Sequence, residues 1–279
     1  MRLSPIVSAL ALFSLSACED NRTHPVPLPP YQAAAQQGFC LPNLDGRIDA
    51  HELEAAVGIP AQFRISPAGM ARPVDLQGSL DNQGVRVWDW SAAAPGEQKA
   101  AFAAQALQGA WFAPSFPGGQ FTVPLDPGGR TLAVYRKDAE AFWLLGLASA
   151  EPNPPEGRTL MAYDQQLALY RFPIQPGAKW TAQGKVQKGL FRGLPYIGVD
   201  IYETEVDALG TLHLPDLSLT QVQRVRTRVQ VQPAVGKSTS RRQVSFLFEC
   251  LGEVARAVSQ EDETKADFTT ASEVRRLGL

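Results

Sequence analysis

The chain has 279 residues, of which 44% are hydrophobic and 19% are charged, with 26 lysines and arginines against 28 aspartates and glutamates. This composition is typical of a globular protein with one large or two small domains. The nearly neutral charge argues against a nucleic-acid partner, because nucleic-acid binding needs a basic surface. The 23 glycines and 22 prolines favour turns and short strands over helices.

The first eighteen residues have the organisation of an export signal. Arg2 precedes an apolar run of about fourteen residues that closes on small residues and a cysteine. A transmembrane helix needs roughly 20 apolar residues, and this run is shorter and contains Pro5, so a retained anchor is disfavoured. Ordinary cleaved secretion is the other, less favoured alternative.

The end of this run, Leu15-Ser16-Ala17-Cys18, resembles the lipobox of bacterial lipoproteins. The resemblance implies that residues 1–17 are a signal peptide that is removed, and that the Cys18 thiol is acylated. The protein would then be lipid-anchored to a bacterial cell membrane, with the outer membrane favoured. Its folded part would lie in the periplasm or at the cell surface.

The cysteine count fits an exported protein. If Cys18 carries lipid, Cys40 and Cys250 remain as a pair in an oxidising compartment, and we expect a disulfide between them. The bond would close a loop of about 210 residues and stabilise the fold by about 4–5 kcal/mol on the chain-entropy estimate. Two unrelated buried thiols are the alternative.

Residues 18–36 are predicted to be a proline-rich tether. Prolines at positions 25, 27, 29 and 30 remove backbone donors and favour extended polyproline structure, which suits a semi-rigid spacer above a lipid surface. The segment 31–37 favours a short helix that ends at Gly38.

Residues 37–60 are predicted to be a helix-loop-helix, and part of them resembles an EF-hand calcium loop. With Gly46 as its turn glycine, the candidate calcium ligands are Asn43, Asp45, Arg47 (through its backbone carbonyl), Asp49 and Glu52. The first position, normally aspartate, is Leu41, so any site would bind calcium weakly. The competing interpretation is structural, with Asp49 and Glu52 forming a capping box that opens a helix over 50–57.

Residues 61–279 are predicted to be one antiparallel β domain, because the hydrophobic period changes to two. One alanine-rich segment, 97–107, favours a helix instead, and 151–157 is either a seam between two sub-units or a long loop. The expected strands are 61–66, 74–80, 85–90, 121–125, 131–136, 142–148, 160–172, 179–190, 196–207, 219–231, 243–250, 254–259 and 268–277.

The segment 219–231 alternates most cleanly. One of its faces carries valines and the other carries Arg224, Arg226 and Arg228, which indicates a sheet with one face in water. Glu203 and Glu205 of the preceding strand are candidate cross-strand partners for these arginines. Contact with an anionic lipid or glycan is the alternative role of this stripe.

The predicted fold class is therefore mainly β, a curved antiparallel sheet (half-barrel or sandwich) preceded by the EF-hand-like helix-loop-helix. Long antiparallel strands behind a lipobox resemble the lipoprotein-localisation folds of LolA and LolB. In that family a curved sheet wraps an apolar cavity for acyl chains. The resemblance covers 61–279 and implies a fold more than a function.

Motifs for catalysis are not recognisable. His24, His51 and His213 lack metal-ligand spacing, and neither a C-x-x-C nor a G-x-S-x-G sequence occurs. The carboxylates of 200–207 are more typical of a polar sheet face than of a glycosidase pair. The aromatic residues Trp88, Trp90, Trp111, Phe112 and Phe116 are expected to pack in the core, with a sugar platform or a lipid cavity as the alternative.

We therefore expect a non-catalytic, lipid-anchored envelope protein. It would bind or carry an apolar or envelope ligand (a lipid, a glycan or an envelope protein), or act as a structural or interaction module. The alternative is a weak calcium-dependent adhesion module that uses residues 43–52, and an envelope hydrolase is third. The membrane would be contacted through Cys18, calcium is the single cofactor considered, and the sequence identifies no ligand-binding residues.

Overall fold

A computed structural model describes residues 40–67 and 69–278. The predicted signal peptide, the lipidation site Cys18, the tether and the helix over 31–37 lie outside the described residues. Cys40 to Leu279 form one compact unit.

The described residues contain one sheet of 16 strands, in which neighbouring strands are antiparallel except for one parallel pair, β4 with β12. The main path runs β5-β1-β16-β15-β14-β13-β12-β11-β10-β9-β8-β7-β6. The elements in chain order are η1 (Ala50–Glu52), β1 (Pro60–Ile65), β2 (Arg72–Pro73), β3 (Ser79–Leu80), β4 (Arg86–Asp89), β5 (Gln98–Ala103), β6 (Gln105–Ala106), η2 (Ala113–Ser115), β7 (Phe121–Pro124), β8 (Thr131–Lys137), β9 (Ala141–Ser149), β10 (Leu160–Arg171), β11 (Lys179–Phe191), β12 (Leu194–His213), β13 (Ser218–Pro233), β14 (Thr239–Phe248), β15 (Gly252–Ser259) and β16 (Thr270–Leu277).

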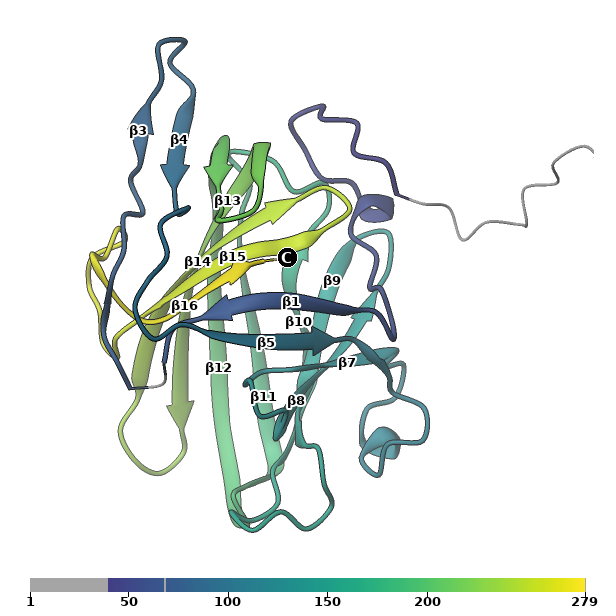
Figure 1. Ribbon diagram of the computed structural model, residues 1–279. Coiled ribbons are helices and arrows are strands. Elements are labelled where there is room, and N and C mark those ends of the chain that lie inside the picture. The colour runs from purple at the N-terminus through teal and green to yellow at the C-terminus, as the bar shows by residue number, and fades with distance from the viewer. Residues whose placement is uncertain (1–39, 68, 279) are drawn as a thin grey trace, which may run out of the picture. The chain divides into compact units, whose positions relative to one another are not determined.

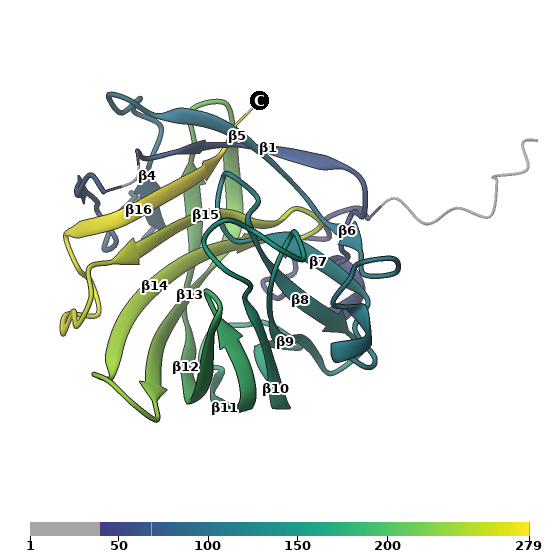
Figure 2. The same cartoon turned by 90° about the horizontal axis from the view of Figure 1, so that it is seen from below.

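This sheet nearly closes on itself. One edge is β5, which pairs with β1, and the other is β6, which pairs with β7. A single residue, Ala104, separates β5 from β6 in the sequence, so the two edges are adjacent parts of one chain segment. Figures 1 and 2 show the strands curving around an interior.

The two faces of the sheet carry different side chains, because successive residues of a strand point to opposite faces. On β14, Phe246 is paired with Ala255 and the adjacent Ser245 with Arg256. Burial raises the pKa of Tyr135 on β8, and the charge of Arg256 on β15, which lies on the same face as Ser245, opposes this rise. Because these two strands are far apart in the strand order, the two side chains approach each other across the interior of the curved sheet. The face of Ser245 therefore looks into the interior, and the face of Phe246 looks outward.

The outward face of β12–β16 is covered by the segment that carries the hairpin β3–β4. Trp88 and Trp90 pack edge-on against Phe246, with ring centroids 4.9 and 5.0 Å away. The hairpin itself extends beyond the sheet at the upper left of Figure 1. The largest core cluster of the described residues thus lies on the outer side of the sheet, between strands and covering segment.

Two predicted helices are wrong. The segment 97–107 forms β5 and β6. Its β5 pairs with β1, and this pairing buries Phe102 against Phe63. The predicted helix over 50–57 is a three-residue 3-10 turn, Ala50–Glu52, so the helix-loop-helix does not form in the described residues. The capping box of Asp49 and Glu52 is nevertheless present.

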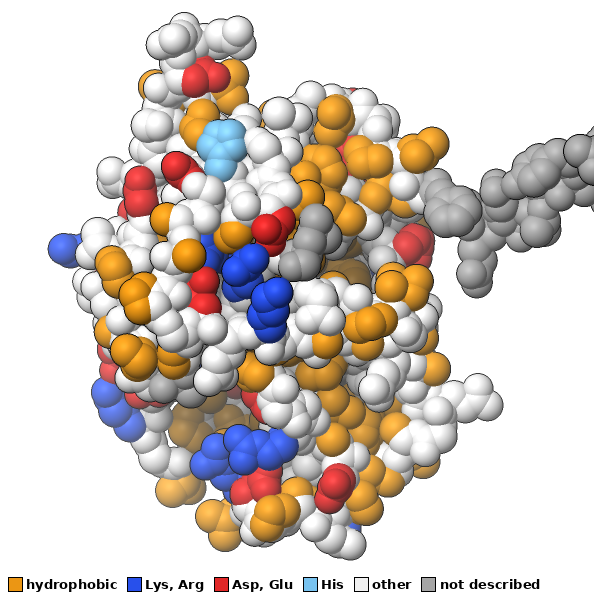
Figure 3. Space-filling model, in the orientation of Figure 1, with side chains coloured by type: hydrophobic (Ala, Val, Ile, Leu, Met, Phe, Trp, Pro, Cys, Tyr) orange, Lys and Arg blue, Asp and Glu red, His pale blue; other side chains and the backbone are white. Residues whose placement is uncertain are grey.

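The strands predicted from residue 121 onward are confirmed, with ends that shift by a few residues. The segment 151–157 is a loop between β9 and β10, which pair with each other. On the face shown in Figure 3, basic and acidic side chains lie close together with hydrophobic ones scattered between them.

Candidate functional site

The predicted disulfide between Cys40 and Cys250 is present, with Cα atoms 5.4 Å apart and a sequence separation of 210 residues. Cys250 lies in the turn between β14 and β15. Its backbone N–H also donates to the carbonyl of Glu52 at 2.8 Å. The disulfide and this hydrogen bond fasten the segment before β1 to the sheet.

The candidate calcium ligands have partners within the protein. The Arg47 guanidinium lies 3.3 Å from a carboxylate oxygen of Asp45 and 3.2 Å from one of Asp49. Glu52 is 1% exposed and accepts the Asp49 N–H at 2.8 Å. The side-chain oxygen of Asn43 accepts the N–H of Asp45 at 2.9 Å. A calcium ion would therefore have to displace Arg47 from this loop.

Glu249 supports the same loop and is a residue that sequence reasoning missed. Its buried carboxylate accepts the N–H groups of Asn43 and Leu44 at 2.6 and 2.9 Å. The predicted disulfide of the adjacent Cys250 brings Glu249 near this loop, but no sequence pattern identifies its carboxylate as the acceptor. Across residues 40–67 and 69–278, no group of three or more His, Cys, Asp or Glu side chains is arranged to hold a metal ion. Calcium binding at the loop stays a prediction.

One arginine of the stripe on β13, Arg224, is buried and a second, Arg226, is partly buried, contrary to the predicted solvated face. The Arg224 side chain is 7% exposed and holds the Asp207 carboxylate through two bonds of 2.9 and 2.6 Å. Arg226 lies 3.0 Å from the same carboxylate and also pairs with Asp267. The covering segment brings a further contact, because Trp88 lies beneath the Arg224 guanidinium at 5.3 Å.

The exposed end of the stripe follows the predicted pairing in part. Arg228 faces Glu203 across the strands, with a nitrogen–oxygen distance of 3.4 Å. Glu205 faces Arg226, but its carboxylate pairs with Lys179 of β11 at 2.8 Å. The register of β12 with β13 was predictable from alternation. The ion-pair partners of Glu205 and Arg226 were not, because they are Lys179 of β11 and Asp207.

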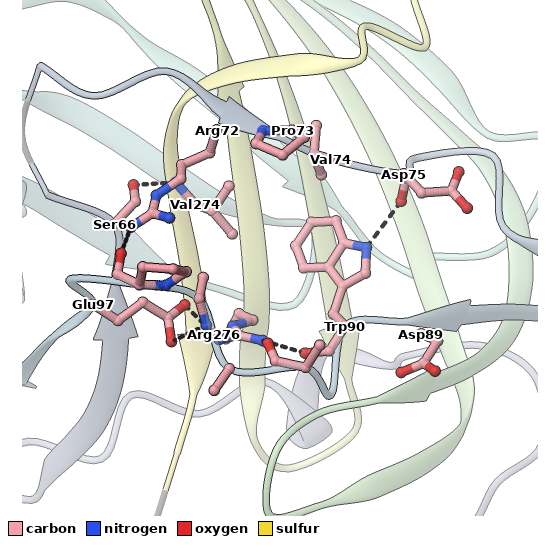
Figure 4. A pocket seen from close by; sticks show the side chains of 14 residues that line it. Ser66, Arg72, Pro73, Val74, Asp75, Asp89, Trp90, Glu97, Val274 and Arg276 are labelled. Atoms are coloured by element: carbon pink, nitrogen blue, oxygen red, sulfur yellow. Dashed lines mark hydrogen bonds and ion pairs between the residues drawn. The ribbon is translucent and has the colours of Figure 1, made fainter.

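Four of the five aromatic residues are buried in the core, as predicted, and Trp111 is partly buried against it. Trp88, Phe112 and Phe116 are at most 2% exposed, and the Trp111 indole donates to the carbonyl of Ser149 at 3.0 Å. Trp90 is also largely buried, but one side of its indole forms the wall of a pocket (Figure 4).

This Trp90 pocket has a volume of about 290 Å³ and lies between β16, the chain around β2 and the loop that follows β4. In Figure 4 the indole lies across the pocket from Arg72 and Ser66, and its N–H donates to the carbonyl of Asp75 at 2.9 Å. Its lining is mostly apolar and consists of Ser66, Arg72, Pro73, Val74, Asp75, Asp89, Trp90, Ala92, Ala93, Ala94, Pro95, Glu97, Val274 and Arg276.

Two buried arginines hold the loop that closes the Trp90 pocket. Arg276, 4% exposed, donates to the carbonyls of Trp90 and Ala92 and pairs with Glu97. Arg72, 9% exposed, donates to the carbonyl of Pro95. The Nε atoms of both arginines are buried without a hydrogen-bond partner. A pocket of this kind suits an apolar group that carries a hydrogen-bond acceptor, since unpaired buried donors are costly.

The interior of the sheet holds a second polar constellation. Tyr163 donates to Asp200 at 2.5 Å, and a Cβ at Gly184 would lie 2.7 Å from the Tyr163 ring, so glycine makes room for it. Asp200 is 8% exposed, and its second oxygen has no partner. Burial raises the pKa of Asp200, and the Tyr163 hydrogen bond opposes this only in part.

The opposite wall of the interior is charged. Arg256 lies 3.0 Å from Glu273 and 3.5 Å from Glu253. The guanidinium of Arg275 stacks over the Phe102 ring at 4.1 Å. Burial near these groups raises the pKa of Tyr135 to about 12. The described interior is thus lined by phenolic and charged groups as well as apolar ones.

No protein-family model matches the chain, and no curated protein or solved structure shows significant similarity to it. Among the described residues there is no helix of the length and apolarity that membrane crossing requires. The residues of the Trp90 pocket were missed from the sequence, because they come from four segments that pairing with β16 and β12 brings together.

Proposed function

We propose that this chain is an exported, lipid-anchored envelope protein that binds the apolar part of an envelope ligand in the Trp90 pocket without catalysing a reaction. The observation that carries the proposal is the pocket itself, an apolar cleft of about 290 Å³ with two arginine donors at its margin. Known small-molecule sites have the same mixture of a mainly apolar lining and few polar groups.

Two further observations support the compartment and the attachment. The Cys40–Cys250 bond suits an oxidising compartment, in which disulfides persist. The lipobox-like Leu15-Ser16-Ala17-Cys18 would attach the protein to a bacterial membrane, with the outer membrane favoured, and place the folded part in the periplasm or at the cell surface.

The size of the Trp90 pocket limits what it can hold. At about 290 Å³ it lies at the lower end of the range for small-molecule sites, roughly 300–1,000 Å³. One short acyl segment or one compact apolar group fits this volume, and a whole diacyl lipid does not. An acceptor on that group, such as an ester carbonyl or a carboxylate, would meet the free Nε–H of Arg72.

The envelope-hydrolase alternative has less support. His213 and Ser218 are hydrogen-bonded at 2.8 Å, and Asp89 lies beside His213 in the parallel strand pair. The Asp89 carboxylate, however, accepts hydrogen bonds from Ser91. A triad needs its acid to orient the histidine, and here the acid is bound to another residue.

Native mass spectrometry of the full lipidated protein, purified from its own envelope, tests the proposal. We expect a bound small molecule in the wild type and its loss in Ala93→Phe, because Ala93 is an exposed residue of the lining whose enlargement fills the pocket. Ala234→Phe, at an exposed position outside the pocket, is the matched control. Equal ligand retention in both variants would refute the Trp90 pocket as the site.

Labelling cells with a clickable fatty acid tests the anchor separately. The wild type should be labelled and Cys18→Ala should not. Equal labelling of the two would refute the lipobox reading and leave the pocket experiment unaffected.

A further inference from the structure

A second hollow lies on the outer surface of the sheet, where β11, β12, β13 and β14 run side by side. It has a volume of about 520 Å³ and shares no lining residue with the Trp90 pocket. Its lining consists mainly of charged residues and threonines, together with Trp180, Gln243 and Ala266. The Gln243 side chain donates to Ser245 on the interior face, so the outward polar groups are the charged side chains and Thr181. We call it the β11–β14 groove.

The charges of the groove are mixed, with a surplus of cations. Four of its lining residues are lysine or arginine and two are glutamate. Lys179 pairs with Glu205 at 2.8 Å, and Arg228 pairs with Glu203 at 3.4 Å. These two pairs balance both carboxylates of the groove.

The remaining two cations differ from each other. Arg226 is bound by Asp207 and Asp267, which lie outside the groove lining. Arg242 donates its Nε–H to the carbonyl of Glu263 at 3.1 Å, and no carboxylate in residues 40–67 and 69–278 forms an ion pair with it. Arg242 therefore brings an unbalanced positive charge to the groove.

This set of groups matches a hydroxylated ligand with sparse negative charge. Arginine and lysine donate to hydroxyl and carboxylate oxygens, glutamate accepts from hydroxyl groups, and the hydroxyl of Thr181 can do both. Guanidinium and carboxylate form strong charge-assisted hydrogen bonds, so Arg242 and the partly exposed Arg228 would prefer a carboxylate. Acidic polysaccharides carry one carboxylate on each uronic-acid unit, between hydroxyl groups.

Other ligand classes fit the groove less well. An acyl chain would meet ion pairs instead of an apolar wall, and burying polar groups against it is unfavourable. Nucleic acid carries a dense negative charge and needs a strongly basic surface, whereas Glu203 and Glu205 lie in the groove. We propose that the β11–β14 groove binds a segment of an acidic, uronate-containing polysaccharide, with Arg242 and Arg228 as its carboxylate-binding residues.

Calorimetry with oligosaccharides of matched length tests this site. The probes are hexamers of galacturonate and of mannuronate, and the control is the fully methyl-esterified galacturonate hexamer, which lacks the charge. We expect at least one free acid to bind, the ester to bind about tenfold more weakly or not at all, and binding to weaken with added salt. Absence of heat with both acids at millimolar concentration, or equal binding of acid and ester, would overturn the proposal.

Variants locate the site on the molecule. Arg242→Gln should weaken binding of the acid about tenfold, while Arg241→Gln should leave it within about twofold. Arg241 is the adjacent residue of β14, pairs with Glu261 at 2.7 Å and does not line the groove. If Arg242→Gln lowers the melting temperature, Arg228→Gln replaces it in the comparison with Arg241→Gln, because the ion pair of Arg228 is exposed. Equal losses in Arg241→Gln and Arg242→Gln would contradict the assignment.

Discussion

The substitution Asp207→Asn tests whether the arginine stripe of β13 is a buried ionic cluster. Asp207 is 11% exposed on its side chain and neutralises both Arg224 and Arg226, at 2.6 and 3.0 Å. The amide keeps the shape of the carboxylate but leaves two poorly solvated cations without their shared charge. Breaking such a buried pair costs about 3–5 kcal/mol. We expect a loss near the lower value, about 3 kcal/mol, because Asp267 still contacts both arginines.

Urea unfolding followed by tryptophan fluorescence measures this loss. With a denaturant slope of about 3 kcal/mol/M, the unfolding midpoint should fall by about 1 M. Glu203→Gln is the matched control, because its pair with Arg228 has side chains that are 47% and 40% exposed. Exposed pairs contribute about 0–1 kcal/mol, so the control should unfold almost like the wild type. If Asp207→Asn costs less than about 1 kcal/mol, or no more than Glu203→Gln, the cluster is not buried as described.

Three more outcomes are expected. Replacing Cys40 and Cys250 by serine should lower the free energy of unfolding by about 5 kcal/mol, since the loop that they close is long. Urea unfolding curves measure this loss. Mass spectrometry without reductant should find no free thiol at either position in the wild type. Burial raises the folded-state pKa of Asp200 above its unfolded value. The wild type should therefore lose stability as pH rises through the folded-state pKa. The free energy of unfolding of Asp200→Asn should increase relative to that of the wild type over the same pH range. A stability difference between the two that does not change with pH would contradict this. Calorimetry with millimolar calcium should give little heat for the wild type and more for Arg47→Ala, in which the guanidinium no longer competes for Asp45; no heat from either protein would end the calcium hypothesis.

Alternation of apolar and polar residues was sufficient to predict most of the long strands. It located β8 to β16, because a strand with one buried face shows a hydrophobic period of two. It also predicted that Arg228 lies opposite Glu203, because the two residues belong to strands that are consecutive in the sequence. It failed for 97–107, where alanine content favours a helix. There the pairing with β1 and the packing of Phe102 decide the structure, and tertiary contacts override propensity.

The candidate sites were less predictable than the strands. Nothing in the sequence connects Arg72, Trp90 and Arg276, which meet at the Trp90 pocket, since each belongs to a different segment. The acidic loop at 43–52 looked like a metal site because its carboxylates are regularly spaced. In the structure Arg47 lies between two of them, a contact that the motif does not specify.

By itself, the sequence predicted the mainly β class and the pairing of Cys40 with Cys250, which are both present, because these follow from period and cysteine number. The export-type N-terminus stays a prediction. The tertiary structure decided which polar residues are buried. Arg224 is polar and alternates with valines like an exposed residue, yet the segment around Trp88 crosses over it and makes it part of the core. Local pattern identifies the face of a strand, and only the folded chain determines whether another segment covers that face.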